Sequence, residues 1–234
     1  MNRYLLGAAV SALMAAAAGS AQAADPSYSQ RATATDWSGF YLGVHAGYVD
    51  GQTDWDLGPG VPLVVEPSGF AGGALVGYNH QIDNFVFGLE ADITLGDISE
   101  GPKNFGVVGV QSADVNYIAT VRGRLGYAFD TWMPFVTGGA GFADLEIFDS
   151  IGGGPTRDSQ LLTGFVVGAG VEADLSRLFG LQIGGGSLTG RVEYMYGQYG
   201  SELFQIGATP EGADLETNTV RAALVWRFSG LSAM

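Results

Sequence analysis

The sequence predicts an all-β protein, an eight-stranded antiparallel transmembrane β-barrel with its strands in up-and-down meander order. Three observations favour this fold class: stretches in which apolar residues alternate with small or polar ones, an excess of glycine, and connections that are alternately short and long. Alternation with period two separates the two faces of a strand. Glycine occupies 38 of the 234 positions, which is roughly twice its usual share.

The N-terminal sequence MNRYLLGAAVSALMAAAAGSAQA predicts a signal peptide. Arg3 supplies a positive charge, Leu5 to Ala18 form an apolar stretch, and Ala21-Gln22-Ala23 matches a small-x-small cleavage site. An uncleaved anchor is the alternative, but the apolar stretch is shorter than a spanning helix needs. The expected organisation is a signal peptide over 1–23, a short periplasmic segment over 24–35, the barrel over 36–228 and a C-terminal extension over 229–234.

The first alternating segment is WSGFYLGVHAGY, from Trp37 to Tyr48. Phe40, Leu42 and Val44 share an apolar face, whereas glycines occupy most of the other face. In a soluble β-sandwich the glycine-rich face would meet water, and glycine on a water-facing strand surface weakens the strand. Inside a narrow barrel, however, a bare position leaves room for long side chains from neighbouring strands. We therefore expect the apolar face to meet lipid and the glycine-rich face to line the interior.

Seven further segments follow the same pattern. In one of them, VNYIATVRGRLGY, the alternation places Val115, Tyr117 and Val121 on the lipid side, with Asn116 and Thr120 inside. The other six are GFAGGALVGYN, FVFGLEADIT, MPFVTGGAGFA, TGFVVGAGVEA, LTGRVEYMY and NTVRAALVWRF. Short runs of this kind, bounded by turn residues, are typical of strands.

The connections favour a barrel that crosses a membrane. Those at 80–84 and 129–133 are tight, whereas those near 50–68, 97–113, 146–161 and 198–215 are long, polar and rich in turn residues. Short turns on one side and long loops on the other are typical of outer-membrane barrels. The third short-side turn, DLSRLFGLQIGGGS, is longer than this scheme expects, and favours either a helical turn or extended strands.

Aromatic residues gather at the predicted strand ends, as they do in the belts at a membrane–water boundary. On the short-turn side they are Trp37, Phe40, Tyr78, Phe85, Tyr127, Phe129, Trp132 and Trp226. On the long-loop side they are Tyr48, Phe70, Phe142 and Tyr196. Their clustering favours a membrane-embedded outer face.

The predicted inner face carries charges of both signs. Four acidic and five basic residues fall on it, although the net charge of the whole chain is −14. Buried charges are costly unless they are paired, so the near balance favours ion pairs inside the barrel. The expected interior charge network consists of Glu90, Asp92, Arg122, Arg124, Glu172, Arg191, Glu193, Arg221 and Arg227.

Several motifs, in order along the chain, resemble one family. WSGFYLGVHAGY, GFVVGAGVEADL, RVEYMYG and NTVRAALVWRF are similar to segments of small alphaproteobacterial outer-membrane proteins, the porin-like surface-antigen family that includes RopB and haemin-binding members. The resemblance spans almost all of the chain after residue 23. It implies an OmpA-like eight-stranded barrel in the cell outer membrane, with its loops at the cell surface. It also implies insertion by the outer-membrane assembly machinery, which reads a terminal aromatic residue; Phe228 fits, although Ser229 to Met234 follow it.

No residue pattern predicts a catalytic, cofactor or metal site. His45 has no evident serine partner near the rim, and His80 falls at a short turn. Asp50, Asp54 and Asp56 lack the spacing and glycine of a calcium loop. An enzyme is therefore not expected. The strong negative charge disfavours nucleic acid as a partner. The chain has no cysteine, so no disulfide stabilises it.

The sequence thus favours a non-enzymatic outer-membrane barrel with a structural role in envelope integrity and acidic surface loops. Two alternatives stay open: a small-conductance porin that transports small solutes, and a haem-binding surface protein. An eight-stranded interior is just wide enough to be filled by side chains, which disfavours a sizeable pore. The expected partners are outer-membrane lipid and lipopolysaccharide, the latter bridged to the acidic loops by divalent cations.

Overall fold

The computed structural model describes residues 35–56, 62–65, 67–104, 110–149, 156–180, 186–206 and 209–228. The chain divides into two compact units, residues 1–33 and 34–234, and all described residues belong to the second. The expected signal peptide and C-terminal extension lie outside the described residues, as does the expected periplasmic segment except for Thr35. Within the described ranges, no helix is both long enough and apolar enough to cross a membrane.

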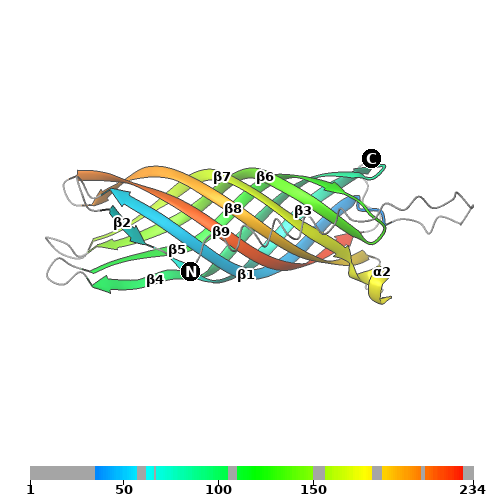
Figure 1. Ribbon diagram of the computed structural model, residues 1–234, viewed down its shortest axis with the longest axis horizontal. Coiled ribbons are helices and arrows are strands. Elements are labelled where there is room, and N and C mark those ends of the chain that lie inside the picture. Colours follow the sequence, from blue (N-terminus) through cyan, green and yellow to red (C-terminus); the bar gives the residue numbers. More distant parts are fainter. Residues whose placement is uncertain are drawn as a thin grey trace, which may run out of the picture. The chain divides into compact units, whose positions relative to one another are not determined.

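Nine antiparallel strands and one short helix make up the described part of the chain (Figure 1). Each of the eight long strands pairs with the next one along the chain, and β1 pairs with β9, which closes the sheet into a barrel. The predicted eight-stranded meander is thereby confirmed. The short strand β2 only extends the sheet beside β1, where Thr53 lies opposite Val65. The bounds are β1 Gly39–Asp56, β2 Pro62–Val65, β3 Ser68–Ile82, β4 Phe85–Asn104, β5 Val110–Tyr127, β6 Trp132–Asp149, β7 Thr156–Asp174, α2 Leu175–Phe179, β8 Gly186–Ile206 and β9 Thr209–Phe228.

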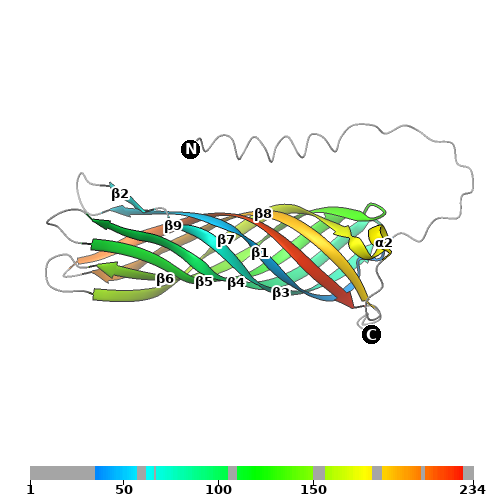
Figure 2. The same cartoon turned by 90° about the horizontal axis from the view of Figure 1, so that it is seen from below.

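The two ends of the barrel differ. The tight connections after β3 and β5 lie at one end, together with α2; we call it the turn end and the opposite end the loop end (Figure 2). Toward the loop end the strands run further than predicted. Between β8 and β9 only residues 207–208 are left, where a loop over 198–215 was expected. That expectation was wrong because the ladder of backbone hydrogen bonds continues through polar, glycine-rich sequence, which shows no apolar alternation.

Side chains alternate between the outer face and the interior along the middle of the long strands. On β4, Phe87 and Leu89 are 49% and 68% exposed, whereas Val86 and Glu90 are 0% and 4% exposed. The same contrast holds on β1, where Leu42 is exposed and the neighbouring Tyr41 is buried. A continuous apolar surface around the whole wall is typical of a barrel that is surrounded by hydrocarbon.

The alternation shifts near the loop end of β5. A β-bulge between Val115 and Tyr117 inserts one extra residue relative to β6. As a result Val115 is buried and Asn116 is exposed, the reverse of the predicted sides. Beyond the bulge, Thr120 is buried and Val121 is exposed, as predicted. On β5, the alternation in the sequence therefore assigns the faces correctly at Thr120 and Val121, on the turn-end side of the bulge, but not at Val115 and Asn116.

Toward the loop end, the described interior holds a cluster of buried apolar side chains. Val49, which follows Tyr41 and His45 along β1 in that direction, is 1% exposed. It belongs to a cluster that we call the apolar layer: Val49, Ala71, Ile98, Val115, Ile118, Ala143, Leu162, Tyr199 and Leu215. This part of the bore is therefore filled by packed hydrocarbon side chains.

At the turn end, Trp37 closes the interior. Its side chain is 0% exposed and packs with Val86, Ala128 and Met133. Its backbone N–H donates to Oε1 of Gln81 over 2.8 Å. The prediction of Trp37 as a belt residue is therefore wrong. The residue precedes the first strand, and the chain there turns inward across the mouth, so the outer-face alternation of β1 does not extend to it.

Glycines on the inner face make room for long side chains. At Gly77, the ring of Tyr41 occupies the place that a Cβ atom would take. At Gly170, a Cβ would lie 2.7 Å from Cζ of Phe135, closer than carbon atoms approach without a clash. These bare positions allow the interior to hold aromatic and charged side chains in a narrow bore.

Candidate functional site

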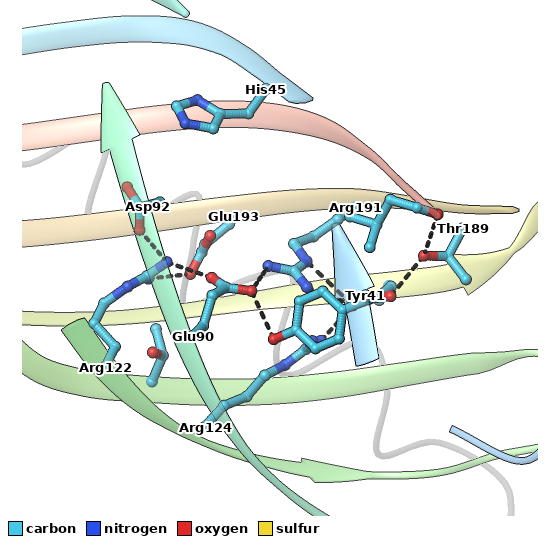
Figure 3. A network of polar contacts seen from close by, with 12 residues as sticks. Tyr41, His45, Glu90, Asp92, Arg122, Arg124, Thr189, Arg191 and Glu193 are labelled. Atoms are coloured by element: carbon cyan, nitrogen blue, oxygen red, sulfur yellow. Dashed lines mark hydrogen bonds and ion pairs between the residues drawn. The ribbon is translucent and has the colours of Figure 1, made fainter. Parts of the chain in front are cut away.

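The nine charged residues predicted for the interior are all buried inside the barrel, with none more than 6% exposed. Eight of them are joined by ion pairs and occupy the bore between the apolar layer and the turn end (Figure 3). We call this group the charge layer: Glu90, Asp92, Arg122, Arg124, Glu172, Arg191, Glu193 and Arg221. The ninth residue, Arg227, lies nearer the turn end.

Arg122 of β5 stands at the centre of the charge layer. Its Nη2 lies 2.9 Å from Oδ2 of Asp92 and also contacts Glu90, both on the neighbouring strand β4. Its Nη1 lies 2.7 Å from Oε1 of Glu193, which belongs to β8 on another part of the wall. A single guanidinium group therefore binds three carboxylates and connects strands that are not neighbours in the sheet.

A second set of ion pairs lies toward the turn end. Nε of Arg191 donates to Oε2 of Glu172 over 3.1 Å, and the two residues are register partners on β8 and β7. Arg191 also contacts Glu90 of β4, which again joins distant strands. Arg124 contacts Glu172 as well, and its guanidinium carbon lies 4.0 Å from the ring centroid of Phe135.

Arg221 of β9 completes the charge layer. Its Nη1 lies 3.0 Å from Oδ1 of Asp92, and its Nε donates to Oε2 of Glu193 over 3.0 Å. Nε2 of His45 lies 3.5 Å from the same guanidinium. Each of the four carboxylates in the layer thus contacts at least two of the four arginines. Full pairing of this kind is what buried charges require.

Three hydroxyl groups add hydrogen bonds to the carboxylates. The Tyr41 hydroxyl donates to Glu90 over 2.9 Å, Thr120 donates to Asp92 over 2.6 Å, and Thr189 donates to Glu172 over 2.6 Å. These three residues were absent from the predicted network. A signal was present in the sequence, because period two places each of them on the inner face.

Arg227 takes part in a separate arrangement at the turn-end mouth. Its Nη2 lies 3.6 Å from Oδ2 of Asp174, and its guanidinium carbon lies 4.9 Å from the ring centroid of Trp37. The hydroxyl of Thr35 donates to Asp174 over 3.4 Å, and the Arg177 side chain donates to Thr35 over 3.0 Å. These contacts hold the residues before β1 across the mouth of the barrel.

A small cavity separates the charge layer from the apolar layer. It measures about 10 Å³ and is bordered by Asp92, Thr120 and Ile118 among others. That volume suits about one water molecule. A hydrated ion or a solute needs far more space.

The charge layer offers little chemistry beyond binding its own members. Among the described residues, no three His, Cys, Asp or Glu side chains are placed so that they could hold a metal ion. His45 is buried beside Arg221, and His80 is exposed near the turn end. The arrangement braces the wall from within, since its ion pairs connect β4 and β5 to β8 and β9.

The family comparison agrees with the barrel geometry. The chain matches the family described as outer membrane protein beta-barrel domain over residues 9–228. The 25 kDa outer-membrane immunogenic protein of Brucella abortus is 28% identical over 193 residues, which cover 82% of this chain and 79% of the relative. The 22 kDa outer membrane protein of Rhizobium leguminosarum bv. viciae is 28% identical over 197 residues, which cover 83% and 80%. The crystal structure of Neisserial surface protein A covers 82% of this chain and 98% of its own, at 16% identity and a TM-score of 0.46.

The family match includes every described strand, and the names of both relatives identify them as outer-membrane proteins. The resemblance inferred from the sequence motifs is thereby confirmed. The chain belongs to the outer membrane protein beta-barrel family and is a protein of the outer membrane.

Proposed function

We propose that this protein is a non-conducting barrel with a structural role in the outer membrane, and that it is neither a porin nor an enzyme. The observation that carries the proposal is the set of ion pairs that cross the bore. Arg122 contacts Glu193, and Arg191 contacts Glu90, in each case between strands that are not sheet neighbours. A water-filled channel along the axis would have to separate these groups.

Opening such a channel is energetically unfavourable. Removing one partner of a buried ion pair costs about 3–5 kcal/mol, and each carboxylate of the charge layer contacts at least two arginines. A solute would also have to pass the apolar layer, where Leu162 and Leu215 are 0% exposed, and Trp37 at the turn end. Three barriers in series support a role other than transport.

We further propose that the loop end faces the cell surface, as the longer connections of outer-membrane barrels do. In this orientation Phe228, at the end of β9, serves as the aromatic signal for the outer-membrane assembly machinery. The sequence near the loop end is acidic, with Asp50, Asp54, Asp56, Glu66, Glu202, Glu211, Asp214 and Glu216. Because lipopolysaccharide is also anionic, divalent cations would be needed to bridge the two.

Conductance in planar lipid bilayers tests the closed bore. We expect the purified, lipid-refolded barrel to show no current steps of general-porin size. Large, stable, voltage-gated steps would contradict the proposal and favour the small-conductance porin. A haem titration of the same sample tests the other alternative, because a saturable shift of the haem absorption band would favour a haem-binding protein.

Chelation tests the proposed cation bridge. Outer membranes are extracted in mild detergent with magnesium or with a chelator, and the lipopolysaccharide that copurifies with the barrel is measured. We expect the chelator to remove most of it. Equal amounts under both conditions would mean that the acidic loops do not bind lipopolysaccharide through cations.

A further inference from the structure

The aromatic girdle at the turn end has a gap. Six of the long strands carry an outward-facing aromatic residue near this end: Phe40, Tyr78, Phe85, Tyr127, Trp132 and Trp226. Among the described residues of β7 and β8, the outward positions at this end are instead Val171, Ala173, Leu188 and Gly190. Two neighbouring strands of the wall therefore lack the residues that anchor a barrel at the membrane–water boundary.

Helix α2 lies at the turn end, between β7 and β8 in the sequence (Figures 1 and 2). The side chain of Leu175 lies over Gly190, where a Cβ atom would come within 3.2 Å of Leu175 Cδ1. Gly190 faces outward, because Arg191 next to it points into the bore and Val192 is 60% exposed. The backbone N–H of Leu188 donates to Ser176 Oγ over 2.8 Å, which fastens the helix to the start of β8.

The helix has one polar and one apolar side. Arg177 points to the mouth, where its Nη1 lies 3.0 Å from Oδ1 of Asp130. Leu178 and Phe179 are 52% and 70% exposed. Local signals fix this turn: Asp174 caps it by accepting from the N–H of Arg177 over 3.1 Å, and Gly180 ends it with a left-handed φ of 66°.

We propose that Leu178 and Phe179 are inserted among the phospholipids of the inner leaflet of the outer membrane, so that α2 completes the girdle over β7 and β8. Short turns of outer-membrane barrels face the periplasm, which places the turn end in that leaflet. The apolar side of α2 is continuous with the lipid-facing surface, since Leu175 covers Gly190 of the outer wall. An apolar helix side with a charged opposite side is suited to the headgroup boundary. The proposal requires the outer-membrane location but not a closed bore.

Because the chain has no cysteine, a single introduced cysteine can be labelled specifically, which allows a direct test. Single variants Phe179→Cys, Phe85→Cys and Asp36→Cys are labelled with an environment-sensitive dye and refolded in phosphatidylcholine vesicles. Each labelled variant is refolded in two parallel samples, one of plain lipid and one of lipid with bromine atoms near the headgroup end of the acyl chains. Bromine quenches the fluorescence of dyes in contact with it. Phe85 is a lipid-facing girdle residue and Asp36 is exposed at the turn-end mouth. We expect quenching at position 179 to be comparable to that at 85 and several-fold stronger than that at 36.

A second variant links the result to the position of α2. Gly190→Val places a branched side chain where Leu175 now lies, so we expect it to reduce quenching at position 179 and to leave position 85 unchanged. The proposal is wrong if position 179 behaves like position 36, which would place the helix tip in water. It is equally wrong if the dye at 179 is shielded from water but not quenched by the brominated lipid, since a protein would then cover the helix. Gel mobility before and after boiling confirms that each variant is folded.

Discussion

The charge layer and the apolar layer close the same bore in different ways. Both exclude water: Arg122 and Glu193 are 1% exposed in the first, and Leu162 and Leu215 are 0% exposed in the second. The charge layer is stable only while each charge keeps its partners, because an unpaired buried charge is costly. The apolar layer has no such partners to lose, and damage there leaves only a void. Two adjacent parts of one interior should therefore respond very differently to the loss of one side chain.

The largest expected effect is that of Arg122→Ala. This substitution leaves Glu90, Asp92 and Glu193 without a shared partner in a buried site. We expect a loss of about 3–5 kcal/mol in the free energy of unfolding, measured by urea titration of lipid-refolded protein. The matched control is Arg177→Ala, which removes an ion pair with an exposed Asp130 and a hydrogen bond to Thr35; it should cost clearly less, because an exposed ion pair contributes only about 0–1 kcal/mol. Equal losses for the two variants would mean that the charge layer is hydrated.

An intermediate effect is expected for the apolar layer. Leu162→Ala truncates a fully buried side chain and leaves a void in its place, which should cost about 2–4 kcal/mol in the same titration. Its neighbour Leu161 is 49% exposed on the outer face, where lipid fills the space that a smaller side chain leaves. Leu161→Ala should therefore be clearly milder. If Leu161→Ala destabilises more than Leu162→Ala, the assignment of the two faces of β7 is wrong.

The smallest effect is expected for a single hydrogen bond within the charge layer. Thr120→Val keeps the side-chain shape but removes the donor to Asp92, while Arg122 and Arg221 still bind that carboxylate. We expect a loss of about 1–2 kcal/mol. Thr163→Val, on the exposed outer face, is the control and should not destabilise. A loss for Thr120→Val as large as that for Arg122→Ala would show that the hydroxyl, and not the arginine, holds the layer together.

Period two and charge balance predicted nine charged residues for the bore, and the strand register shows how these residues lie relative to one another. Glu90 and Arg122 are register partners, as are Glu172 and Arg191, and Glu193 and Arg221. No β-bulge interrupts the strands around these six residues. Each pair therefore lies side by side on the inner face. The contacts across the bore were not predictable in the same way. That Arg122 meets Glu193 depends on how the closed sheet brings distant strands together, and the alternation within one strand carries no such information.

The errors have local physical causes. The sides of Val115 and Asn116 were reversed because a bulge on β5 adds a residue that no sequence pattern marked. Trp37 was assigned to the belt because its residue type is typical there, whereas its place before β1 lets it turn into the mouth. The turn after β7 was left open between a helix and longer strands. In the structure this turn contains the helix α2, which begins at the capping contact of Asp174 and ends at the left-handed Gly180.

The order of the strands has a consequence for how the barrel forms. Among the eight long strands that the structure describes, every pairing joins strands that follow each other along the chain, except that between β1 and β9, where Tyr41 lies opposite Arg227. Bringing such distant residues together is entropically unfavourable and slow, and an unclosed sheet would leave unpaired backbone groups in hydrocarbon. Arg221 of β9 reaches Asp92 of β4, so the charge layer can be complete only after this pairing has formed. The ion pairs therefore stabilise the closed barrel and not its open precursor, and such late-forming contacts chiefly slow the reopening of a folded protein.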